Sequence, residues 1–411
     1  MNADPATTRN RRVVLLAPLT PAPGGNGLAM RAGTFLDALA TDSPVDVVIV
    51  PVVGPGAVTD WVRARARHVV VVDPVAEAAA PSHGVAQLAD PYLRARLETS
   101  APLPQLAALA PPTLAASASA SIGTEPPAAV VVVREYLAPL GINLARFLHA
   151  DRVVVDLDDD TETLLHELGH ADAAAAYGRL ARAWLPDADA VTMASPLDAP
   201  RVAAWYGLAR IETIPNACPR VVPAPPAPGH DRLLFVGNLT YQPNIDAVRE
   251  LVGAILPAIR RDRPTVTVDI VGNHEGRLSA LASPGIVLAG AVADLAPWYA
   301  DADVVVVPLR HGAGTRIKVL EALAYRRPVV ATPTAIAGLH LRGDHDVVIA
   351  EPRHLAAAVL RVLADPSLAA ALADHGFATA TDHYAPEIIA ANVRSVVLAT
   401  RADSRAEHRE Q

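Results

Sequence analysis

The segment that decides the fold is Asp303–Val330, DVVVVPLRHGAGTRIKVLEALAYRRPVV. Its four valines, Val304–Val307, form an apolar run that ends at Pro308, as expected for a strand buried on both faces. A loop containing RHGAG follows, and then an apolar pattern typical of a helix, with Thr315 as the expected N-cap. A strand, a glycine-containing loop and a helix in this order indicate a parallel α/β sheet, in which ligands bind at the carboxyl ends of strands.

The charges at the start of this helix predict an anionic ligand. Arg316 and Lys318 would lie in the first turn, where the helix dipole disfavours cations. Lys318 is the only lysine in the chain, and its compact ammonium is not equivalent to the planar fork of arginine. Gly312 and Gly314 would let a diphosphate approach the backbone and the exposed N–H groups of the helix. Glu321 shares a helix face with Lys318, so an ordinary surface pair without any ligand is the alternative.

Similar patterns run along the whole chain, since apolar runs bounded by turn residues alternate with Ala- and Leu-rich stretches. This is the pattern of parallel sheets covered by helices, so the fold class is α/β. In the first half, strands are predicted at Val13–Ala17, Val45–Val50, Val69–Val72, Val130–Val133, Arg152–Asp156, Ala190–Ala194 and Ile211–Ile214. In the second half, they are predicted at Leu233–Val236, Thr265–Val271, Ile286–Ala289, Val304–Val307, Val329–Ala331 and Val347–Ile349.

A proline-rich segment, Pro219–Pro228, separates the two halves. Its prolines disfavour both helix and central strand, and a chain of 411 residues exceeds the usual limit of a single core. We therefore predict one domain at residues 11–222 and a second at residues 230–382, with a helix at about 387–401 crossing back to the first. Both halves open on a strand that runs into a loop and a helix, VVLLAPLTPAPGGNG and RLLFVGNLTYQPN. Two Rossmann-like domains with a cleft between them are expected.

Composition narrows the class of partners. The chain is 51% hydrophobic and 19% charged, with a formal net charge of −8 that would not attract nucleic acid. Cys218 is the only cysteine, so no internal disulfide and a cytoplasmic location are expected. The apolar run VVLLAP is too short for a signal peptide or a membrane span. We expect Trp61–His68, WVRARARH, to be a solvated basic helix or sheet edge, with contact to an anionic membrane surface as the alternative.

The segment PLRHGAGTRIKVLEALAYRRPVVAT resembles the donor-site signature of family 4, or group 1, glycosyltransferases in the form G-x-G-T-R-x-K-x-x-E-A-x-A-x-x-x-P-V-V. The likeness continues through FVGNLTYQPNIDAV, DIVGN, VLAGAVADLAPWYADADVVVVPL and TAIAGL, and more weakly along the first half. It implies a GT-B fold with two facing Rossmann-like domains. It also implies transfer of a sugar from a nucleotide-diphosphate sugar to an acceptor hydroxyl, with retention and without a metal or other cofactor.

This resemblance assigns roles residue by residue. Lys318 and Arg316 would hold the diphosphate, and Glu321 would bind the ribose hydroxyls. The loop residues expected to contact the donor are Gly237, Asn238, Gly272, Asn273, Val292, His311, Gly312, Ala313, Gly314 and Thr315. Two departures leave the sugar and the choice between UDP and GDP open. Ala313 stands where the common form of the family has a second glutamate, and GNLTYQPN lacks the Arg and Lys that many relatives carry.

On the acceptor side, PAPGGNGLAMR resembles the first loop of the family, although a tight strand-to-helix turn is the alternative. RVVVDLDDD places Asp156, Asp158 and Asp159 at the carboxyl end of a strand. Asp158 is expected to replace a histidine of many relatives in orienting the donor sugar or the acceptor, with a helix-capping acidic cluster as the alternative. The residues expected on this side are Gly24, Gly25, Asn26, Arg31, Glu135 and Tyr136. The acceptor, the catalytic base and the oligomeric state stay undetermined.

Several rival functions use other motifs. The triplet DLD could be a metal-binding D-x-D, but the cationic helix start would already neutralise the diphosphate, so we expect no metal. His166–His170, HELGH, has the form H-E-x-x-H of zinc metalloproteases. Against that reading, Ala173 and Ala176 stand where the extended motif needs glycine and a third histidine. A nucleotide-sugar epimerase on the same double fold and a non-catalytic nucleotide-sugar-binding protein are the remaining alternatives.

Overall fold

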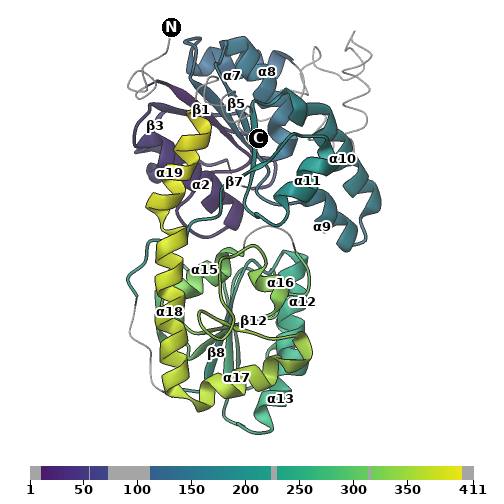
Figure 1. Cartoon of the computed structure of the whole chain (residues 1–411), viewed down its shortest axis with the longest axis vertical. Coiled ribbons are helices and arrows are strands. Elements are labelled where there is room, and N and C mark those ends of the chain that lie inside the picture. The colour runs from purple at the N-terminus through teal and green to yellow at the C-terminus, as the bar shows by residue number, and fades with distance from the viewer. Residues whose placement is uncertain (1–10, 55, 73–111, 224–228, 313–315, 400–411) are drawn as a thin grey trace. The chain divides into compact units, whose positions relative to one another are not determined.

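The computed structural model describes residues 11–54, 56–72, 112–223, 229–312 and 316–399. The chain divides into two compact units (Figure 1). Unit 1 comprises Met1–Pro215 with Glu387–Gln411, and unit 2 comprises Asn216–Pro386. Each unit has its own hydrophobic core, and each is described by itself below.

Unit 1 is built on a parallel sheet of seven strands. They are β1 (Val13–Ala17), β2 (Val45–Ile49), β3 (Ala66–Val71), β4 (Ala129–Val133), β5 (Val153–Asp156), β6 (Ala190–Met193) and β7 (Glu212–Thr213). Their order in the sheet is β3-β2-β1-β4-β5-β6-β7. The chain therefore adds strands in one direction from β1 to β3, and in the opposite direction from β4 onward.

The helices of unit 1 cover this sheet. They are α2 (Gly27–Ala40), α3 (Asp60–Arg63), α7 (Pro112–Ile122), α8 (Ala138–Leu148), α9 (Thr161–Glu167), α10 (Ala171–Trp184), α11 (Ala199–Tyr206) and α19 (Pro386–Val397), with short 3-10 turns η2 (Glu135–Leu137) and η3 (Leu185–Asp187). Helix α19 returns from the far end of the chain and lies beside α2 (Figure 1). There the Arg394 guanidinium donates to the Ala38 carbonyl at 3.2 Å and pairs with Asp42 at 3.3 Å.

Unit 2 contains a second parallel sheet, of six strands. They are β8 (Arg232–Val236), β9 (Thr267–Val271), β10 (Ile286–Gly290), β11 (Val304–Val307), β12 (Val329–Ala331) and β13 (Val348–Ile349), in the order β10-β9-β8-β11-β12-β13. The helices are α12 (Gln242–Glu250), α13 (Leu256–Arg260), α14 (Ala296–Asp301), α15 (Ile317–Ala324), α16 (Pro333–Ile336), α17 (Leu355–Ala364) and α18 (Pro366–Tyr384), with short turns η4 (Leu251–Ile255), η5 (Ser279–Leu281) and η6 (Pro352–His354). Figure 1 shows α18 on one side of this sheet and α12 with α13 on the other.

Burial explains why these strands could be located from sequence. All residues of β1 and of β11 are buried, because helices cover both faces of a parallel sheet and an uninterrupted apolar strand fits there. The predicted α/β class is confirmed, and each predicted strand is present with ends displaced by a few residues at most. The largest displacement is in β3, which begins at Ala66 rather than Val69. This strand lies at the edge of the sheet, so polar residues extend it where an apolar pattern would not.

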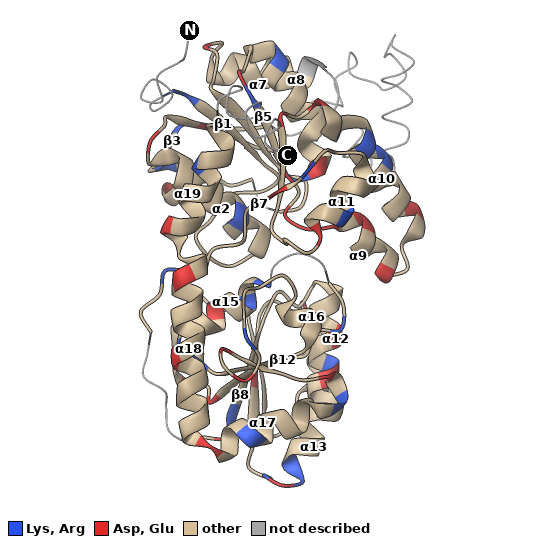
Figure 2. Cartoon of the chain, in the orientation of Figure 1, with Lys and Arg blue, Asp and Glu red and all other residues tan. Residues whose placement is uncertain are grey.

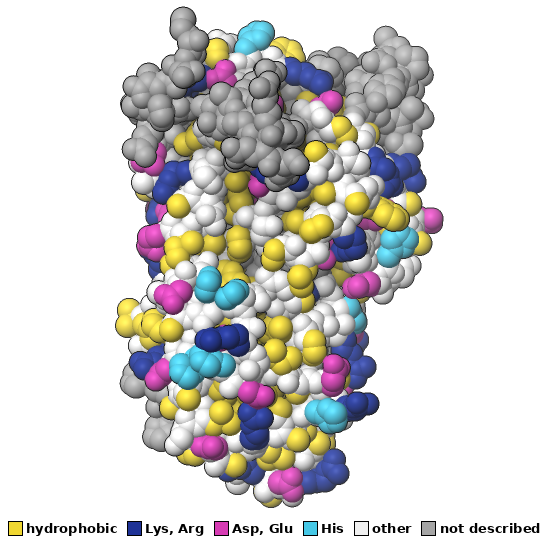
Figure 3. Space-filling view, in the orientation of Figure 1, with side chains coloured by type: hydrophobic (Ala, Val, Ile, Leu, Met, Phe, Trp, Pro, Cys, Tyr) yellow, Lys and Arg dark blue, Asp and Glu magenta, His cyan; other side chains and the backbone are white. Residues whose placement is uncertain are grey.

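The basic stretch Trp61–His68 belongs to α3 and the edge strand β3. Arg65 pairs with Asp37 at 2.7 Å, and Arg67 pairs with the buried Asp46 at 2.8 Å. Part of the positive charge of this stretch is therefore neutralised within the unit. Figure 2 shows charges of both signs intermixed over both units, and on the face seen in Figure 3 hydrophobic side chains are interspersed with charged ones.

Within the described ranges, no single helix has the length and apolar composition needed to cross a membrane. One pair of helical segments, Pro352–Ala364 and Pro366–Val397, meets both criteria when taken together, but the two are bent by 103° relative to one another.

Candidate functional site

Sheet order shows where a ligand site is expected in each unit. The direction of strand addition reverses between β8 and β11 in unit 2, and between β1 and β4 in unit 1. Open parallel sheets bind their ligands outside the carboxyl ends of the strands at such a reversal. The predicted donor-binding residues follow β8, β9, β10 and β11, so the fold brings their loops to one edge of the second sheet.

The loops after β8, β9 and β10 are packed backbone against backbone. The Gly272 N–H donates to the Gly290 carbonyl at 2.8 Å, and the Leu239 N–H donates to the Asn273 carbonyl at 2.9 Å. Gly272 has a φ of +145°, and a Cβ there would lie 1.8 Å from the Gly237 carbonyl oxygen. Only glycine fits this approach. The three loops, with the predicted residues Gly237, Gly272 and Asn273, therefore form one continuous backbone layer.

Two other predicted donor residues belong to the loops after β8 and β10. Asn238 is exposed at the tip of the first loop, and its Oδ1 accepts from the Thr240 N–H at 3.1 Å. Val292 follows the end of β10 and packs against the core of unit 2. Ala313, Gly314 and Thr315 lie outside the described residues.

The start of α15 differs from the prediction. The helix begins at Ile317, and Arg316 rather than Thr315 occupies the N-cap position, with φ −82° and ψ 90°. No side chain at that position caps the helix, and the Arg316 guanidinium instead donates to the Gly312 carbonyl. Lys318 is still in the first turn. Both cations therefore remain at the positive end of the helix dipole, where an anion is favoured.

Lys318 extends from α15 toward the loop after β8. Its Nζ donates to Asn244 Oδ1 and lies 5.0 Å from the centre of the Phe235 ring. A Cβ on Gly237 would come within 3.0 Å of the same Nζ. The lysine thus supplies a cation next to the loop that itself carries none.

The surroundings of Lys318 disfavour its charge. Burial is the largest cause that lowers the pKa of Lys318, the neighbouring Arg316 lowers it further, and together they bring it to about 7 although Glu321 opposes the shift. Its hydrogen-bond partner Asn244 is a neutral amide, which offers no countercharge. A bound anion would restore the ordinary basicity of this amine.

Glu321 lies one helical turn after Lys318. Its Oε2 accepts from the Tyr299 hydroxyl at 3.0 Å, and the Tyr299 ring stacks on Tyr325 with centroids 4.4 Å apart. Burial raises the pKa of Glu321 to about 7, although Tyr299 and Lys318 act in the opposite direction. Tyr299, which stacks on Tyr325, thus holds Glu321 in a fixed orientation, and the carboxylate of Glu321 can accept further hydrogen bonds from hydroxyl groups.

The loop after β11 is held by α12. Arg310 pairs with Glu250 at 2.8 Å, and His311 Nε2 lies 3.2 Å from Asp246 Oδ2. Asp246 and Glu250 are four residues apart and share a face of the helix. Gly312 follows with a φ of +132°, which favours glycine. His311 and Gly312 therefore lie on an anchored loop.

Asn244 was missed by the sequence analysis. It lies in the first turn of α12, is buried, and donates from Nδ2 to the Asn238 carbonyl at 2.7 Å while accepting from Lys318. The sequence did contain a clue to Asn244. It is a polar residue between Pro243 and Ile245, on a helix face that packs inward, and a buried amide at such a place requires hydrogen-bond partners. Tyr299 was missed as well, since its pattern is that of an ordinary core aromatic.

In unit 1, Arg31 and Asp156 form a completely buried ion pair. The two bonds run from Nε to Oδ2 at 3.0 Å and from NH2 to Oδ1 at 2.6 Å. Arg31 also donates to the Ile214 carbonyl at 2.6 Å, and the Thr192 hydroxyl donates to Asp156 Oδ1 at 2.6 Å. Arg31 thus lies beneath the surface and supports the acidic segment from within. Asp156, the first aspartate of DLD, is occupied by these partners.

Asp158 differs from its acidic neighbours. Its φ is +64°, and its side chain is 16% exposed, 4.0 Å from Arg31 and 3.8 Å from Arg134. Burial, followed by the nearby Asp159, raises the pKa of Asp158 to about 7. Helix capping is performed by Asp160, whose Oδ1 accepts from the Thr163 N–H at 3.0 Å. The capping alternative therefore applies to Asp160 and not to Asp158.

The loop after β4 meets this acidic segment. Arg134 has a φ of +79°, and its guanidinium contacts Asp159 and donates to the Thr161 hydroxyl at 2.6 Å. Glu135 is buried 3.7 Å from the same guanidinium, and burial raises its pKa. Tyr136 is buried edge-on against Tyr177, with centroids 6.3 Å apart. Both predicted residues are thus at the expected edge of the sheet, in a buried polar layer.

The loop after β1 is a strand-to-helix turn. Gly24 and Gly25 are exposed, and a Cβ at either position would meet no atom within 4 Å. Asn26 caps α2, because its Oδ1 accepts from the Leu28 N–H at 2.8 Å. The geometry matches the alternative of a tight turn, and the acceptor-binding role of these three residues stays a prediction.

The H-E-x-x-H segment does not form a zinc motif. Helix α9 ends at Glu167, Gly169 has a φ of +81°, and His170 is the N-cap of α10. The two imidazoles therefore do not share a face of one helix, as zinc coordination by this motif requires. Among the described residues, no group of three or more His, Cys, Asp or Glu side chains is arranged to hold a metal ion.

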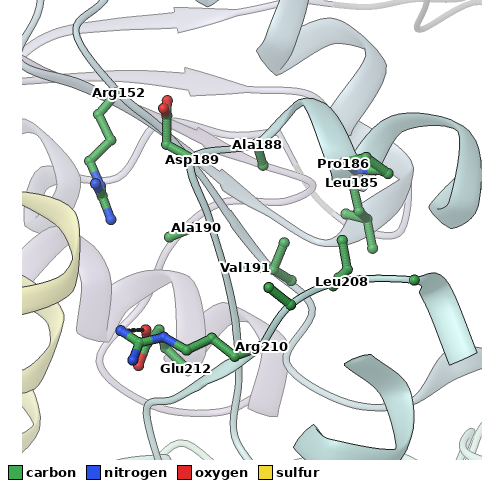
Figure 4. A pocket seen from close by; sticks show the side chains of 12 residues that line it. Arg152, Leu185, Pro186, Ala188, Asp189, Ala190, Val191, Leu208, Arg210 and Glu212 are labelled. Carbon is green, nitrogen blue, oxygen red and sulfur yellow. Dashed lines mark ion pairs between the residues drawn. The ribbon is translucent and has the colours of Figure 1, made fainter. Parts of the chain in front are cut away.

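A cavity of about 290 Å³ lies in unit 1 at the amino-terminal ends of β5, β6 and β7. Figure 4 shows Arg152 and Asp189 on one side of it and Leu208 with the Arg210–Glu212 ion pair on another. The cavity is at the opposite edge of the sheet from Asp158 and the loop after β4. It therefore does not belong to the predicted site.

Part of the chain matches a known family. Residues 230–365 match the family described as glycosyl transferases group 1. This range contains the loops after β8, β9, β10 and β11 and the whole of α15, so it includes Lys318 and Glu321. No curated protein matches the chain in sequence.

Solved structures are similar over almost the whole chain. Sucrose-phosphate synthase from Thermosynechococcus elongatus is 17% identical, with a TM-score of 0.66 over 94% of this chain and 98% of that one. HepE from Anabaena, in complex with UDP and glucose, is 14% identical, with a TM-score of 0.63 over 95% of this chain and 100% of that one. Trehalose-6-phosphate synthase, from work on glycosyltransfer with retention, is 14% identical, with a TM-score of 0.62 over 94% and 98%.

At these identities the structural similarity establishes the fold alone, and the family match supplies the class of enzyme. The predicted GT-B fold is confirmed by these structures and by the two parallel sheets. The epimerase, metalloprotease and binding-protein alternatives find no support. Residues 230–365 match the group 1 glycosyltransferases and the chain has the GT-B fold, and the two findings together indicate a glycosyltransferase.

Proposed function

We propose that this enzyme transfers a sugar from a nucleoside-diphosphate sugar to an acceptor hydroxyl, with retention of the anomeric configuration and without a metal ion. The observation that carries the donor assignment is the start of α15. There, Arg316 and Lys318 lie together at the amino end of a helix that no N-cap side chain caps. This arrangement favours a diphosphate.

Each group at this edge of unit 2 has a role in the proposal. Lys318 and Arg316 bind the diphosphate, and Glu321, held by Tyr299, accepts hydrogen bonds from the ribose hydroxyls. The glycine-lined loops after β8, β9 and β10 receive the nucleotide. The anchored segment His311–Gly312 contacts the phosphates and the sugar. HepE, whose structure contains UDP and glucose, has the same fold, which supports a nucleotide-sugar donor.

In the proposed reaction, the bond between the anomeric carbon and the diphosphate oxygen breaks, and the acceptor oxygen bonds to the same face of that carbon. Lys318 and Arg316 stabilise the negative charge that develops on the leaving diphosphate. A phosphate oxygen of the donor takes the proton of the acceptor hydroxyl, so no enzymic base is assigned. Retention is supported by the similarity in fold to trehalose-6-phosphate synthase.

The acceptor is proposed to bind to unit 1 at the strand reversal between β1 and β4. Asp158 is a half-buried member of the acidic segment beside that reversal, and its strained backbone and raised pKa are typical of functional positions. We assign it to orienting the transferred sugar or the acceptor. Arg31 and Arg134 keep its carboxylate in place.

A donor panel tests the proposal. UDP and GDP are first compared by thermal shift, because a ligand that binds the native state raises its stability. The matching sugar nucleotides are then incubated with candidate acceptors, and the products are identified by mass spectrometry and NMR. A nucleotide-sugar epimerase would convert the donor without any acceptor, whereas a binding protein would give no product.

Lys318→Ala is the decisive variant for this site. We expect it to fold normally and to lose about 2–4 kcal/mol of transition-state stabilisation, comparable to the loss of one preorganised electrostatic donor. Turnover close to that of the wild type would contradict the assignment. Arg232→Ala is a control, since this arginine pairs at the opposite, amino-terminal end of β8 and should leave turnover unchanged.

A further inference from the structure

The most informative contact in unit 2 joins three segments through one amide. Asn244 Oδ1 accepts from Lys318 Nζ on α15, and Asn244 Nδ2 donates to the Asn238 carbonyl in the loop after β8 at 2.7 Å. The backbone N–H of Asn244 donates to Tyr241 O at 3.0 Å, which fixes the residue at the start of α12. Both the oxygen and the nitrogen of the Asn244 amide therefore have a hydrogen-bond partner.

The contact between Lys318 and Asn244 lies beside Gly237, a predicted donor-binding residue. A Cβ on Gly237 would be 3.0 Å from Lys318 Nζ and 3.1 Å from Asn244 Nδ2, so lysine, amide and loop meet at one point. Asn244 is 5% exposed, so its side chain is shielded from water. Removal of this amide would remove one hydrogen bond of the lysine side chain and one of the loop after β8.

The chemistry of an amide suits this position better than that of a carboxylate. An amide accepts a hydrogen bond from the ammonium and donates one to a carbonyl, whereas an ionised carboxylate only accepts. A carboxylate would also neutralise the ammonium and repel a phosphate, while the amide orients the ammonium and leaves its charge uncompensated. A residue that served packing alone would need neither property.

We propose that Asn244 is a positioning residue of the donor site, which aims the Lys318 ammonium at the diphosphate and ties the loop after β8 to α15. The inference rests on the proposed function, because it takes the diphosphate as the ligand. Asn244 itself touches no reacting atom. It acts through Lys318 and through the carbonyl of Asn238.

The contact with Lys318 can be tested without any ligand. Because Lys318 is the only lysine in the chain, biosynthetic labelling with ¹³Cε-lysine gives a single NMR signal whose titration reports its pKa. We expect this signal to titrate near pH 7 in the wild type and at clearly higher pH in Asn244→Asp, where a carboxylate replaces the amide. Gln242→Glu is the matched control, because it adds the same charge to the same helical turn at an exposed residue that bonds to Asp246. Its signal should titrate as in the wild type.

The second measurement tests the positioning role. Dissociation constants are measured for the nucleoside diphosphate that the wild type binds and for the matching monophosphate. In Asn244→Asp we expect affinity for the diphosphate to fall about tenfold, which corresponds to about 1.4 kcal/mol. Affinity for the monophosphate should fall much less. Asn244→Leu, which removes both hydrogen bonds without adding charge, should show the same preference for loss of the diphosphate to a smaller extent.

Two results would overturn the inference. One is an unchanged lysine titration in Asn244→Asp. The other is an equal loss of affinity for the monophosphate and the diphosphate, which is the result expected of a residue that only supports the fold. If the wild type binds neither nucleotide while the lysine signal still responds to Asn244→Asp, the contact stands and the proposed donor fails. The two ideas are thereby separated.

Discussion

Lys318 is the residue on which the proposed diphosphate binding depends, and its pKa provides a way to test that proposal. Its amine donates to Asn244, in a place where burial, with the neighbouring Arg316, lowers its pKa to about 7. A bound diphosphate would raise that pKa again, so binding should take up a proton in the range above pH 7. The affinity for the nucleoside diphosphate should therefore be highest near pH 7 and fall as the pH rises toward 9.

The matched variant for this prediction is Lys318→Arg, because arginine stays protonated throughout that range. We expect dissociation constants from isothermal titration to rise by up to about tenfold per pH unit above 7 in the wild type, the limit for the loss of one proton. They should stay nearly constant in Lys318→Arg. The second ionisation of a phosphate lies near pH 6, so the ligand itself does not titrate in this window. Equal pH profiles for the two proteins would contradict the lowered basicity of Lys318.

Arg31 leads to a prediction about stability. Both members of the Arg31–Asp156 pair are completely buried, so removal of one leaves an unpaired charge in the core. We expect Arg31→Met to lower the free energy of unfolding by about 3–5 kcal/mol in denaturant titrations. The double variant Arg31→Met with Asp156→Asn should lose less than the sum of the single losses.

A surface pair provides the control for this experiment. Arg11 and Asp151 form an ion pair whose side chains are 40% and 57% exposed, so Arg11→Met should cost no more than about 1 kcal/mol. A small loss in Arg31→Met, comparable to that of Arg11→Met, would show that the buried pair is not what holds the acidic segment in place.

At the scale of elements, the sequence predicted most accurately the strands whose burial on both faces requires a continuous run of apolar residues. The all-valine run of β11 and the apolar run of β1 were located without error, because strands buried on both faces leave a continuous apolar pattern. The start of β3 was placed three residues late, since an edge strand has no such requirement. The start of α15 was misplaced as well. Thr315 had the capping chemistry, but the chain enters the helix through Arg316 with an extended backbone.

The residues of the candidate site differ in the same way in how far the sequence points to them. Arg316 and Lys318 could be proposed from the sequence because a cationic helix start violates a local preference and so indicates a ligand, whereas the role of Glu321 is implied by the family resemblance. The roles of all three stay predictions. Asn244 and Tyr299 could not be placed, because their contacts join residues far apart in sequence, 74 residues in the case of Asn244 and Lys318. A polar residue on an inward helix face was the available clue.

Helix α19 provides the prediction at this scale. Its residues Ile389, Val393 and Val397 recur every four positions and are buried, while Ser395 is exposed on the same helix. Val393→Asp would bury an unpaired carboxylate, and we expect a loss of roughly 3 kcal/mol or more in the stability of unit 1. Ser395→Asp, the matched control, should change stability by less than about 0.5 kcal/mol. Circular dichroism during thermal unfolding measures both, and equal melting temperatures would show that α19 does not dock through this face.

At the scale of the whole molecule, the distribution of the predicted residues between the two units has a direct consequence. All the predicted donor residues lie within Asn216–Pro386, and that segment has a hydrophobic core of its own, made of residues between Cys218 and Tyr384. Since those residues contribute to one sheet and its covering helices, we expect residues 216–386 to fold when expressed alone. The folded segment should bind the nucleoside diphosphate with an affinity within about tenfold of that of the full chain.

The same segment should transfer no sugar, because Asp158 and the loops proposed to bind the acceptor belong to unit 1. Isothermal titration and a transfer assay on the segment and the full chain, run side by side, measure both properties. The Lys318→Ala segment serves as the control that any binding uses the proposed site. If the segment is folded, as judged by a cooperative thermal transition, but binds the nucleotide far more weakly, then unit 1 contributes donor contacts. The donor site would in that case be shared by the two units, and the assignment of nucleotide binding to unit 2 alone would be wrong.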